Sequence, residues 1–327
     1  MRTITLTLLS TLFALLCNAQ KCGPFTINSN GDQIMFAPGN LQYNAALGTH
    51  ACADGTTKQG TFRFAEHQYD YVGNADMGNV YWNDVKCNNT LASSSYDGWI
   101  DHFNWGTSGW NASNGEPWIR SGNNNSYFLG GKSNNNLYGA YAYADWGVYN
   151  QIGDDEPGTW RTLQVDEWIY IVFDRPNASS LHGPVTIQGI LGYMILPDGW
   201  VAPEGITFSH SVGATYTFKQ WEKLEESGAV FFPSGSLSSI GNYWLSDSYG
   251  NNAYRIFFQW GSENLYSTQR NFGLSVRLAK GYSEPTALDE IQYQQQKTAV
   301  KKVIEDGKLY IILPNGTKYD STGRRVK

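Results

Sequence analysis

Tyr243-Trp244-Leu245-Ser246 is one of four short blocks that decide the fold of this chain of 327 residues. The other three are WRTL at 160–163 with DEW at 166–168, LPDGW at 196–200, and GLSVRL at 273–278. Large aromatic side chains bury much apolar area when they enter a core. We therefore expect one core to hold a member of each block, namely Trp168, Trp200, Trp244 and Arg277.

Together the four blocks resemble the skeleton of a bacterial C-type-lectin-like domain, as found in the formylglycine-generating-enzyme-like group and in the Fibrobacter-type major paralogous domain. Three upstream blocks are similar to the N-terminal half of the same secreted proteins: FAPGNLQY at 36–43, GWID at 98–101 with WGTSGW at 105–110, and ADWGVYN at 144–150. The resemblance covers about residues 25–280. It implies an α+β, C-type-lectin-like fold with two helices and short antiparallel strands.

The same resemblance implies recognition in place of catalysis, because ligand-binding members of this group display a variable surface on a rigid fold. Formylglycine-generating enzymes use cysteines late in the fold, and this chain has no cysteine after Cys87. Without the leader the chain keeps Cys22, Cys52 and Cys87. A Cys52–Cys87 disulfide and two unpaired thiols are both open alternatives in an oxidising compartment.

The composition indicates short strands joined by many turns, with 15% aromatic residues, only 16% charged residues and 35 glycines. A chain of 327 residues is long enough for one large domain with a full core and an appendage. The formal net charge is −6. Nucleic acid is therefore not expected as a partner, because a polyanion would be repelled.

The N-terminus has the pattern of a signal peptide over residues 1–19. Arg2 precedes an apolar stretch from Ile4 to Cys17 that is too short for a permanent membrane helix, and Ala19 supplies a small residue for signal peptidase. Acylation of Cys17 is the alternative, but the bulky Leu16 before it does not fit the usual lipoprotein motif. We expect cleavage after Ala19 and a protein that is secreted or held at the outer cell surface.

Two segments have helical periodicity. Residues 164–174 carry acidic side chains in the first turn and apolar residues at three- and four-residue steps. In residues 218–227, Thr217 and Gln220 predict a capping box, and Gly228 ends the helix. The pattern also predicts a hairpin over 185–196 with a Gln-Gly turn, and a short strand over 228–233.

The strand over residues 253–260 is the one on which the functional prediction rests. Residues of a strand point alternately to its two faces. Tyr254, Ile256, Phe258 and Trp260 form the more apolar set, so we assign them to the core. The other set then points outward, and it consists of Arg255, Phe257 and Gln259.

A loop rich in polar and aromatic residues is expected to follow this strand and to lie beside its outward face. Tyr and Arg give large contact area at modest entropic cost, and small polar residues adapt their hydrogen bonds, which is the chemistry of binding surfaces. Ordinary turn residues are the competing interpretation. The predicted ligand-binding residues are Asn251, Asn252, Arg255, Phe257, Gln259, Glu263, Tyr266, Gln269 and Arg270.

Partial matches to metal, cofactor and catalytic motifs fail, because their order or their residues do not fit the known motif. Residues 82–84 (WND) and 116–118 (EPW) resemble motifs of animal C-type lectins, but their order is reversed and a Trp replaces one ligand. The chain has no HExxH motif and no Gly-x-Ser-x-Gly elbow. We therefore expect no catalytic residue, no metal site and no cofactor. A pair of converging carboxylates, with Glu116 and Asp145 as candidates, remains the enzymatic alternative.

Residues 299–327 predict a tail of small β-hairpins after a linker at 283–298. Seven basic and three acidic residues give the tail a charge of +4, which leaves −10 for the rest of the chain of net charge −6. The tail resembles the C-terminal sorting segments of bacterial type IX secretion, which implies contact with an export machinery. An accessory β-unit packed on the main domain is the alternative.

These patterns predict a signal peptide at 1–19, a C-type-lectin-like domain at 20–282, the linker and the tail. The predicted function is non-catalytic recognition or adhesion at the cell surface, with a surface glycan or a protein as the ligand. Two alternatives come from other classes, a structural subunit of a surface appendage and an unrecognised carbohydrate-active enzyme.

Overall fold

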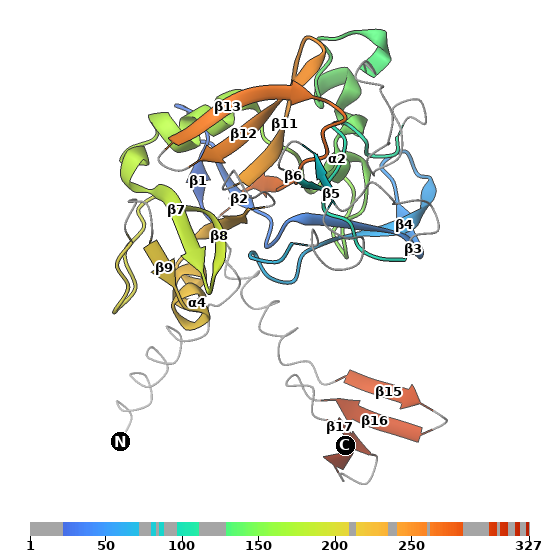
Figure 1. Cartoon of the computed structure of the whole chain (residues 1–327). Coiled ribbons are helices and arrows are strands. Elements are labelled where there is room, and N and C mark those ends of the chain that lie inside the picture. Colours follow the sequence, from blue (N-terminus) through green and yellow to red (C-terminus); the bar gives the residue numbers. More distant parts are fainter. Residues whose placement is uncertain are drawn as a thin grey trace. The chain divides into compact units, whose positions relative to one another are not determined.

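Antiparallel sheets make up most of the ordered elements, with few helices between them (Figure 1). The protein is therefore of the mixed α+β class. The chain divides into two units, the body (Met1–Tyr282) and the tail (Ser283–Lys327). The computed structural model describes residues 22–71, 80–82, 85–87, 97–110, 129–208, 214–234, 241–259, 262–283, 301–305, 308–312, 318–320 and 325–326. The predicted signal peptide and most of the predicted linker lie outside these ranges.

The strands of the body are short, apart from β3, β4 and the strands of one three-stranded sheet. They are β1 (Phe25–Thr26), β2 (Gln33–Phe36), β3 (Leu41–Ala51), β4 (Thr57–Phe64), β5 (Val80–Trp82), β6 (Val85–Cys87), β7 (His182–Ile187), β8 (Ile190–Ile195), β9 (Ala214–Tyr216), β10 (Val230–Pro233), β11 (Gly241–Tyr249), β12 (Asn252–Gln259), β13 (Ser262–Gln269) and β14 (Ala279–Gly281). Their orders are β1-β2-β14, β10-β8-β7-β9 and β11-β12-β13, with β3-β4 and β5-β6 as separate pairs. β14 joins β2, which places the C-terminal end of the body beside its N-terminal end.

The β7–β8 hairpin and β10 confirm two sequence predictions. Gln188 and Gly189 connect β7 to β8 with φ of 46° and 88°. Positive φ at both positions of a two-residue turn matches the twist of the flanking strands. β10 pairs with β8 in antiparallel register, and β9 joins β7 in parallel.

The helix predicted over 218–227 is confirmed as α4 (Phe218–Glu226). Thr217 accepts a hydrogen bond from the Gln220 backbone, and the Gln220 side chain accepts one from the Thr217 backbone, so the capping box is present. Trp221 and Leu224 are buried on one face of the helix.

The helix predicted over 164–174 is confirmed in its extent but not in its type. It starts as α3 (Val165–Ile169) and continues as a π-helix over Tyr170–Asp174, where the Arg175 N–H bonds to the Tyr170 carbonyl. Arg175 explains the change, because its side chain donates to Ile171 O at 2.6 Å and to Asp198 at 2.9 Å. Asp198 belongs to the LPDGW block, so this bond depends on a segment that a local pattern does not reveal.

A further short helix, α2 (Trp146–Tyr149), was not predicted. Asp145 caps it by accepting the Gly147 N–H at 3.0 Å. The remaining helical segments of the described chain are 3-10 turns at Leu129–Gly131, Gly139–Ala144 and Ala178–Ser180.

The described residues form three core clusters, so the expectation of one shared core is wrong. Trp244 belongs to the first cluster and Trp168 to the second, while Trp200 packs on the third. Tyr243 and Trp244 are neighbours on β11 but enter different clusters, because successive strand residues point to opposite faces. β11 therefore lies between two cores.

Arg277 of the GLSVRL block is buried and joins distant segments. Its guanidinium donates to the backbone oxygens of Ala37 at 3.1 Å and Phe231 at 2.9 Å, and to the Asn40 side chain at 3.0 Å. Burial lowers the pKa of Arg277 from its ordinary value. These carbonyl acceptors satisfy a buried cation that would otherwise be costly.

Of the two alternatives left open for Cys52, the structure shows the free thiol, which is buried. Cys22 is also free and buried, and burial raises the pKa of its thiol to about 12. The side chain of Cys87 lies outside the described residues.

The tail is a four-stranded antiparallel sheet in the order β15-β16-β17-β18, as the hairpin pattern predicted. Its strands are β15 (Lys301–Glu305), β16 (Lys308–Ile312), β17 (Lys318–Asp320) and β18 (Arg325–Val326). The Lys318 ammonium lies 4.2 Å from the centre of the Tyr310 ring across β16 and β17. In the described part of the chain, no helix has the length and apolar character needed to cross a membrane.

Candidate functional site

The β11-β12-β13 sheet carries the predicted binding residues, and β12 is its central strand (Figure 1). Ile256 lies opposite Tyr243 on one side and Leu265 on the other, and these side chains face the second core cluster. We call this side the inner face. Ile256 and Phe258 are buried there, which confirms their assignment to the core, and Tyr254 is half-buried on the same side. Trp260, the fourth residue of this set, lies outside the described residues.

The opposite side, here called the outer face, presents two cross-strand rows. The first row is Trp244, Arg255 and Tyr266, and the second is Asn242, Phe257 and Asn264. Directly opposed residues in antiparallel strands have neighbouring side chains. Arg255 and Phe257 therefore do lie opposite the core face, but both are half-buried and not fully exposed.

Arg255 is held in place on the outer face by one hydrogen bond and one aromatic ring. Its Nη1 donates to the Asn242 side-chain oxygen, and its guanidinium carbon lies 4.9 Å from the centre of the Phe257 ring. The Nε atom is buried and has no hydrogen-bond partner within the described chain. Burial lowers the pKa of Arg255 from its ordinary value, and the nearby Tyr266 opposes this shift.

Phe257 and Tyr266 form the aromatic part of the outer face. Their ring centres are 5.8 Å apart at an interplanar angle of 65°, an edge-to-face arrangement. Tyr266 is 48% exposed. Phe257 is half-buried but is not a member of the three core clusters found among the described residues.

Several predicted residues are not brought together on this face. Residues 262–269 were expected as a loop but form β13, so alternation sends Gln269 to the opposite side from Tyr266. Asn252 also lies on that opposite side, and Asn251 is an exposed turn residue. The side chains of Gln259 and Glu263 lie outside the described residues.

Arg270 is corrected from an exposed ligand-binding residue to a buried structural one. Its exposed fraction is 0%. The guanidinium lies 4.5 Å from the centre of the Trp105 ring and donates to Ser133 O at 2.7 Å and Gly250 O at 3.1 Å. These partners are distant in sequence, so composition alone could not identify this role.

The sequence analysis missed Asn242, which is buried and orients Arg255. It also missed Tyr249, which is 58% exposed and packs edge-on against Tyr254 at 5.2 Å. Tyr254 shares the inner face with Ile256, so this aromatic pair lies on the opposite side from Tyr266. Alternation extended through residues 262–269 is the signal that would have identified β13.

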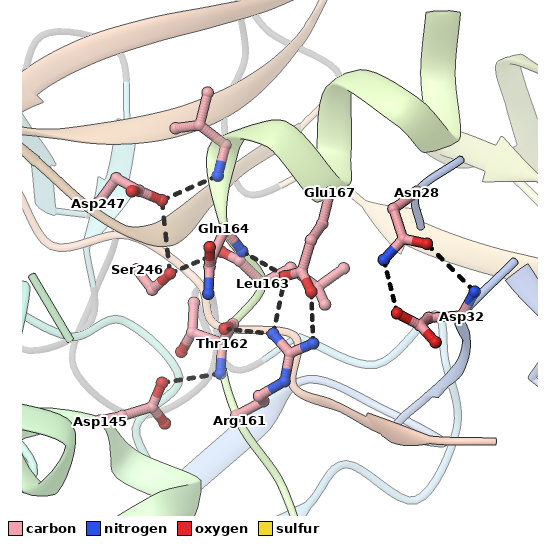
Figure 2. Close-up of polar contacts among 11 residues, drawn as sticks. Asn28, Asp32, Asp145, Arg161, Thr162, Leu163, Gln164, Glu167, Ser246 and Asp247 are labelled. Carbon is pink, nitrogen blue, oxygen red and sulfur yellow. Dashed lines mark hydrogen bonds and ion pairs between the residues drawn. The ribbon is translucent and has the colours of Figure 1, made fainter. Parts of the chain in front are cut away.

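Two carboxylates bond to the segment 161–167, Asp145 at Thr162 and Asp247 at Val165 (Figure 2). Asp247 accepts the Val165 N–H at 2.8 Å and the Tyr138 hydroxyl at 2.8 Å. Burial raises the pKa of Asp247. This arrangement ties β11 to the start of α3.

Asp145, the described member of the enzymatic pair, has a structural role here. It is buried and accepts the backbone N–H groups of Gly147 at 3.0 Å and Thr162 at 2.7 Å (Figure 2). Burial raises the pKa of Asp145. Glu116, the other candidate, lies outside the described residues, as do residues 83–84 of the WND motif and the whole EPW motif.

Ionic interactions near α3 are also structural. Arg161 pairs with Glu167, and Glu167 accepts the Gln164 N–H at 2.7 Å at the start of the helix (Figure 2). Within the described ranges, no group of three or more His, Cys, Asp or Glu side chains is arranged to hold a metal ion.

The chain was compared with protein-family models, with curated proteins and with solved structures, and no match was found in any of the three comparisons.

Proposed function

We propose that this chain is a secreted or cell-surface recognition or adhesion protein with a C-type-lectin-like fold and no catalytic activity. Its ligand is a surface glycan or a protein, and the outer face of β11-β12-β13 binds it. The block resemblance and the sparse helices among antiparallel sheets support the fold assignment. The basic hairpin tail supports delivery through an export machinery.

One observation carries this proposal: Arg255, Phe257 and Tyr266 contact one another on a strand pair whose other side is core. A half-buried phenyl ring beside an exposed tyrosine contributes apolar surface that a ligand can cover. Aromatic and Arg side chains are enriched among the residues that dominate binding energy. β12 and β13 hold them on paired strands, so the face is preorganised and loses little entropy on binding.

The test is binding of the purified full chain to glycan and surface-protein arrays, compared between Tyr266→Ala and Tyr249→Ala. Both are exposed tyrosines on the same sheet, but they lie on opposite faces. We expect Tyr266→Ala to lose array binding by about tenfold or more and Tyr249→Ala to retain it. Equal loss in both variants, or polymerisation of the wild type without array binding, would contradict the proposal.

A further inference from the structure

The guanidinium of Arg255 lacks the carboxylate partner that Arg161 and Arg175 have. Arg161 pairs with Glu167 at 2.5 Å and Arg175 pairs with Asp198 at 2.9 Å. Arg255 instead donates to Asn242, an uncharged acceptor, and no ion pair of Arg255 is found in the described part of the chain. The cation is thus partly withdrawn from water without a carboxylate to compensate it.

The geometry of Arg255 leaves one nitrogen of its guanidinium for an external acceptor. Nη1 is engaged with Asn242 and Nε is buried, so Nη2, for which no hydrogen bond is found among the described atoms, supplies the N–H groups that a ligand can reach. A guanidinium N–H gives a short, charge-assisted hydrogen bond to a carboxylate oxygen. The Phe257 ring lies over the guanidinium and restrains its plane, so these donors are oriented before a ligand arrives.

The neighbouring rings indicate what the carboxylate is attached to. Phe257 and Tyr266 contribute an aromatic surface next to the charge, and Asn264, opposite Phe257, places an amide group beside them. An apolar lining with a small number of oriented polar groups is the usual composition of a small-molecule site. A sugar ring has apolar faces for the aromatic side chains and hydroxyl groups for the amide.

The charge of the chain limits how many carboxylates such a ligand carries. The net charge of the chain is −6 and the tail carries +4, so residues 1–298 carry −10. Long-range repulsion grows with the number of negative charges on a ligand, and it disfavours acidic peptides and polyanions. A single carboxylate gains its contact with Arg255 at short range and adds little to this repulsion.

We infer, on the basis of the proposed function, that the outer face recognises a sugar unit bearing one carboxylate, as in a terminal uronic acid. The carboxylate accepts hydrogen bonds from Arg255, and the sugar ring lies against Phe257 and Tyr266. Asn242 acts as a positioning residue, since it holds Arg255 through Nη1.

The experiment compares binding of the full chain to immobilised oligosaccharides that differ only in their terminal unit, glucuronic acid or glucose. We expect the acidic form to bind about tenfold or more tightly, a preference that weakens with salt. Arg255→Gln should remove the preference, and Arg255→Lys should restore only part of it, because a Lys ammonium keeps the charge but not the planar group that Asn242 and Phe257 hold in place. Arg63→Gln is the matched control, because Arg63 is exposed, stacks on Trp99 and lies outside the outer face.

The possible results distinguish failure of this inference from failure of the proposed function. Equal binding of both oligosaccharides, a preference retained in Arg255→Gln, or binding of an acidic peptide in place of either sugar overturns the carboxylate-sugar inference. In those cases, loss of array binding in Tyr266→Ala still supports recognition by the outer face. If Arg255→Gln melts at a lower temperature than the wild type, its loss of preference could come from unfolding. Tyr266→Ala then serves as the test, and it must reduce binding of the acidic oligosaccharide. Unchanged binding in Tyr266→Ala also overturns the inference.

Discussion

Trp244 and Arg255 lie directly opposite each other on β11 and β12, yet Trp244 is buried and Arg255 is half-buried. The Trp244 indole donates to Phe103 O at 2.6 Å inside the first core cluster. One row further along the outer face, Phe257 lies outside the three clusters. The outer face therefore changes from core to half-buried surface within two rows, and the core supports the proposed site directly.

The first prediction concerns this support. Trp244→Ala should lower the free energy of unfolding by about 3–5 kcal/mol, because it removes a buried indole and leaves a cavity. Tyr266→Ala, on the same row but exposed, should change it by less than about 1 kcal/mol. Urea denaturation measures both values. A small effect of Trp244→Ala would mean that this indole does not anchor the sheet.

The elements that could be predicted from the sequence are those fixed by contacts between residues close in the chain. The Thr217–Gln220 capping box and the Gln188-Gly189 turn each depend on residues close in sequence, and both are present in the structure. Arg270 depends instead on Trp105 and Ser133, far away in the chain, and its burial could not be predicted from a polar neighbourhood.

The candidate site was predicted only in part for the same reason. Alternation placed Arg255 and Phe257 on the correct side of β12. It was not applied to residues 262–269, because their polar composition is typical of a loop, and so Gln269 was assigned to the wrong face. Asn242 was missed because its contact with Arg255 requires the register of β11.

The second prediction concerns pH. Burial raises the pKa of Asp247 above its ordinary value of 3.8, so its contribution to stability is greatest below 3.8 and is lost as the pH rises through the folded-state pKa. Asp247→Asn does not titrate and keeps an acceptor for the Val165 N–H. The stability of the variant minus that of the wild type should therefore increase as the pH rises from 3.8. Denaturation at a series of pH values checks this, and a constant difference would contradict it.

The third prediction concerns the tail. Deletion of residues 283–327 should leave the melting temperature of the body nearly unchanged, because the body and the tail are separate units with their own sheets. If the tail acts in export, the same deletion should change the fraction of protein found outside the cell. Deletion of residues 318–327, which removes β17 and β18, should have the same effect on localisation. A large fall in melting temperature would show that the tail is part of the core of the body.

The last prediction concerns the outer face as a unit. The triple change of Arg255, Phe257 and Gln259 to Ala should abolish ligand binding and leave the free energy of unfolding within about 1 kcal/mol of the wild-type value. Phe257 decides the outcome, because its ring contacts Arg255 and Tyr266 and lies outside the core clusters of the described residues. Phe258→Ala is the matched control on the adjacent position of β12, where the ring is buried in the second cluster, and it should cost about 3–5 kcal/mol. Comparable destabilisation by Phe257→Ala and Phe258→Ala would mean that both faces of β12 are core, and the proposed binding site would then be wrong.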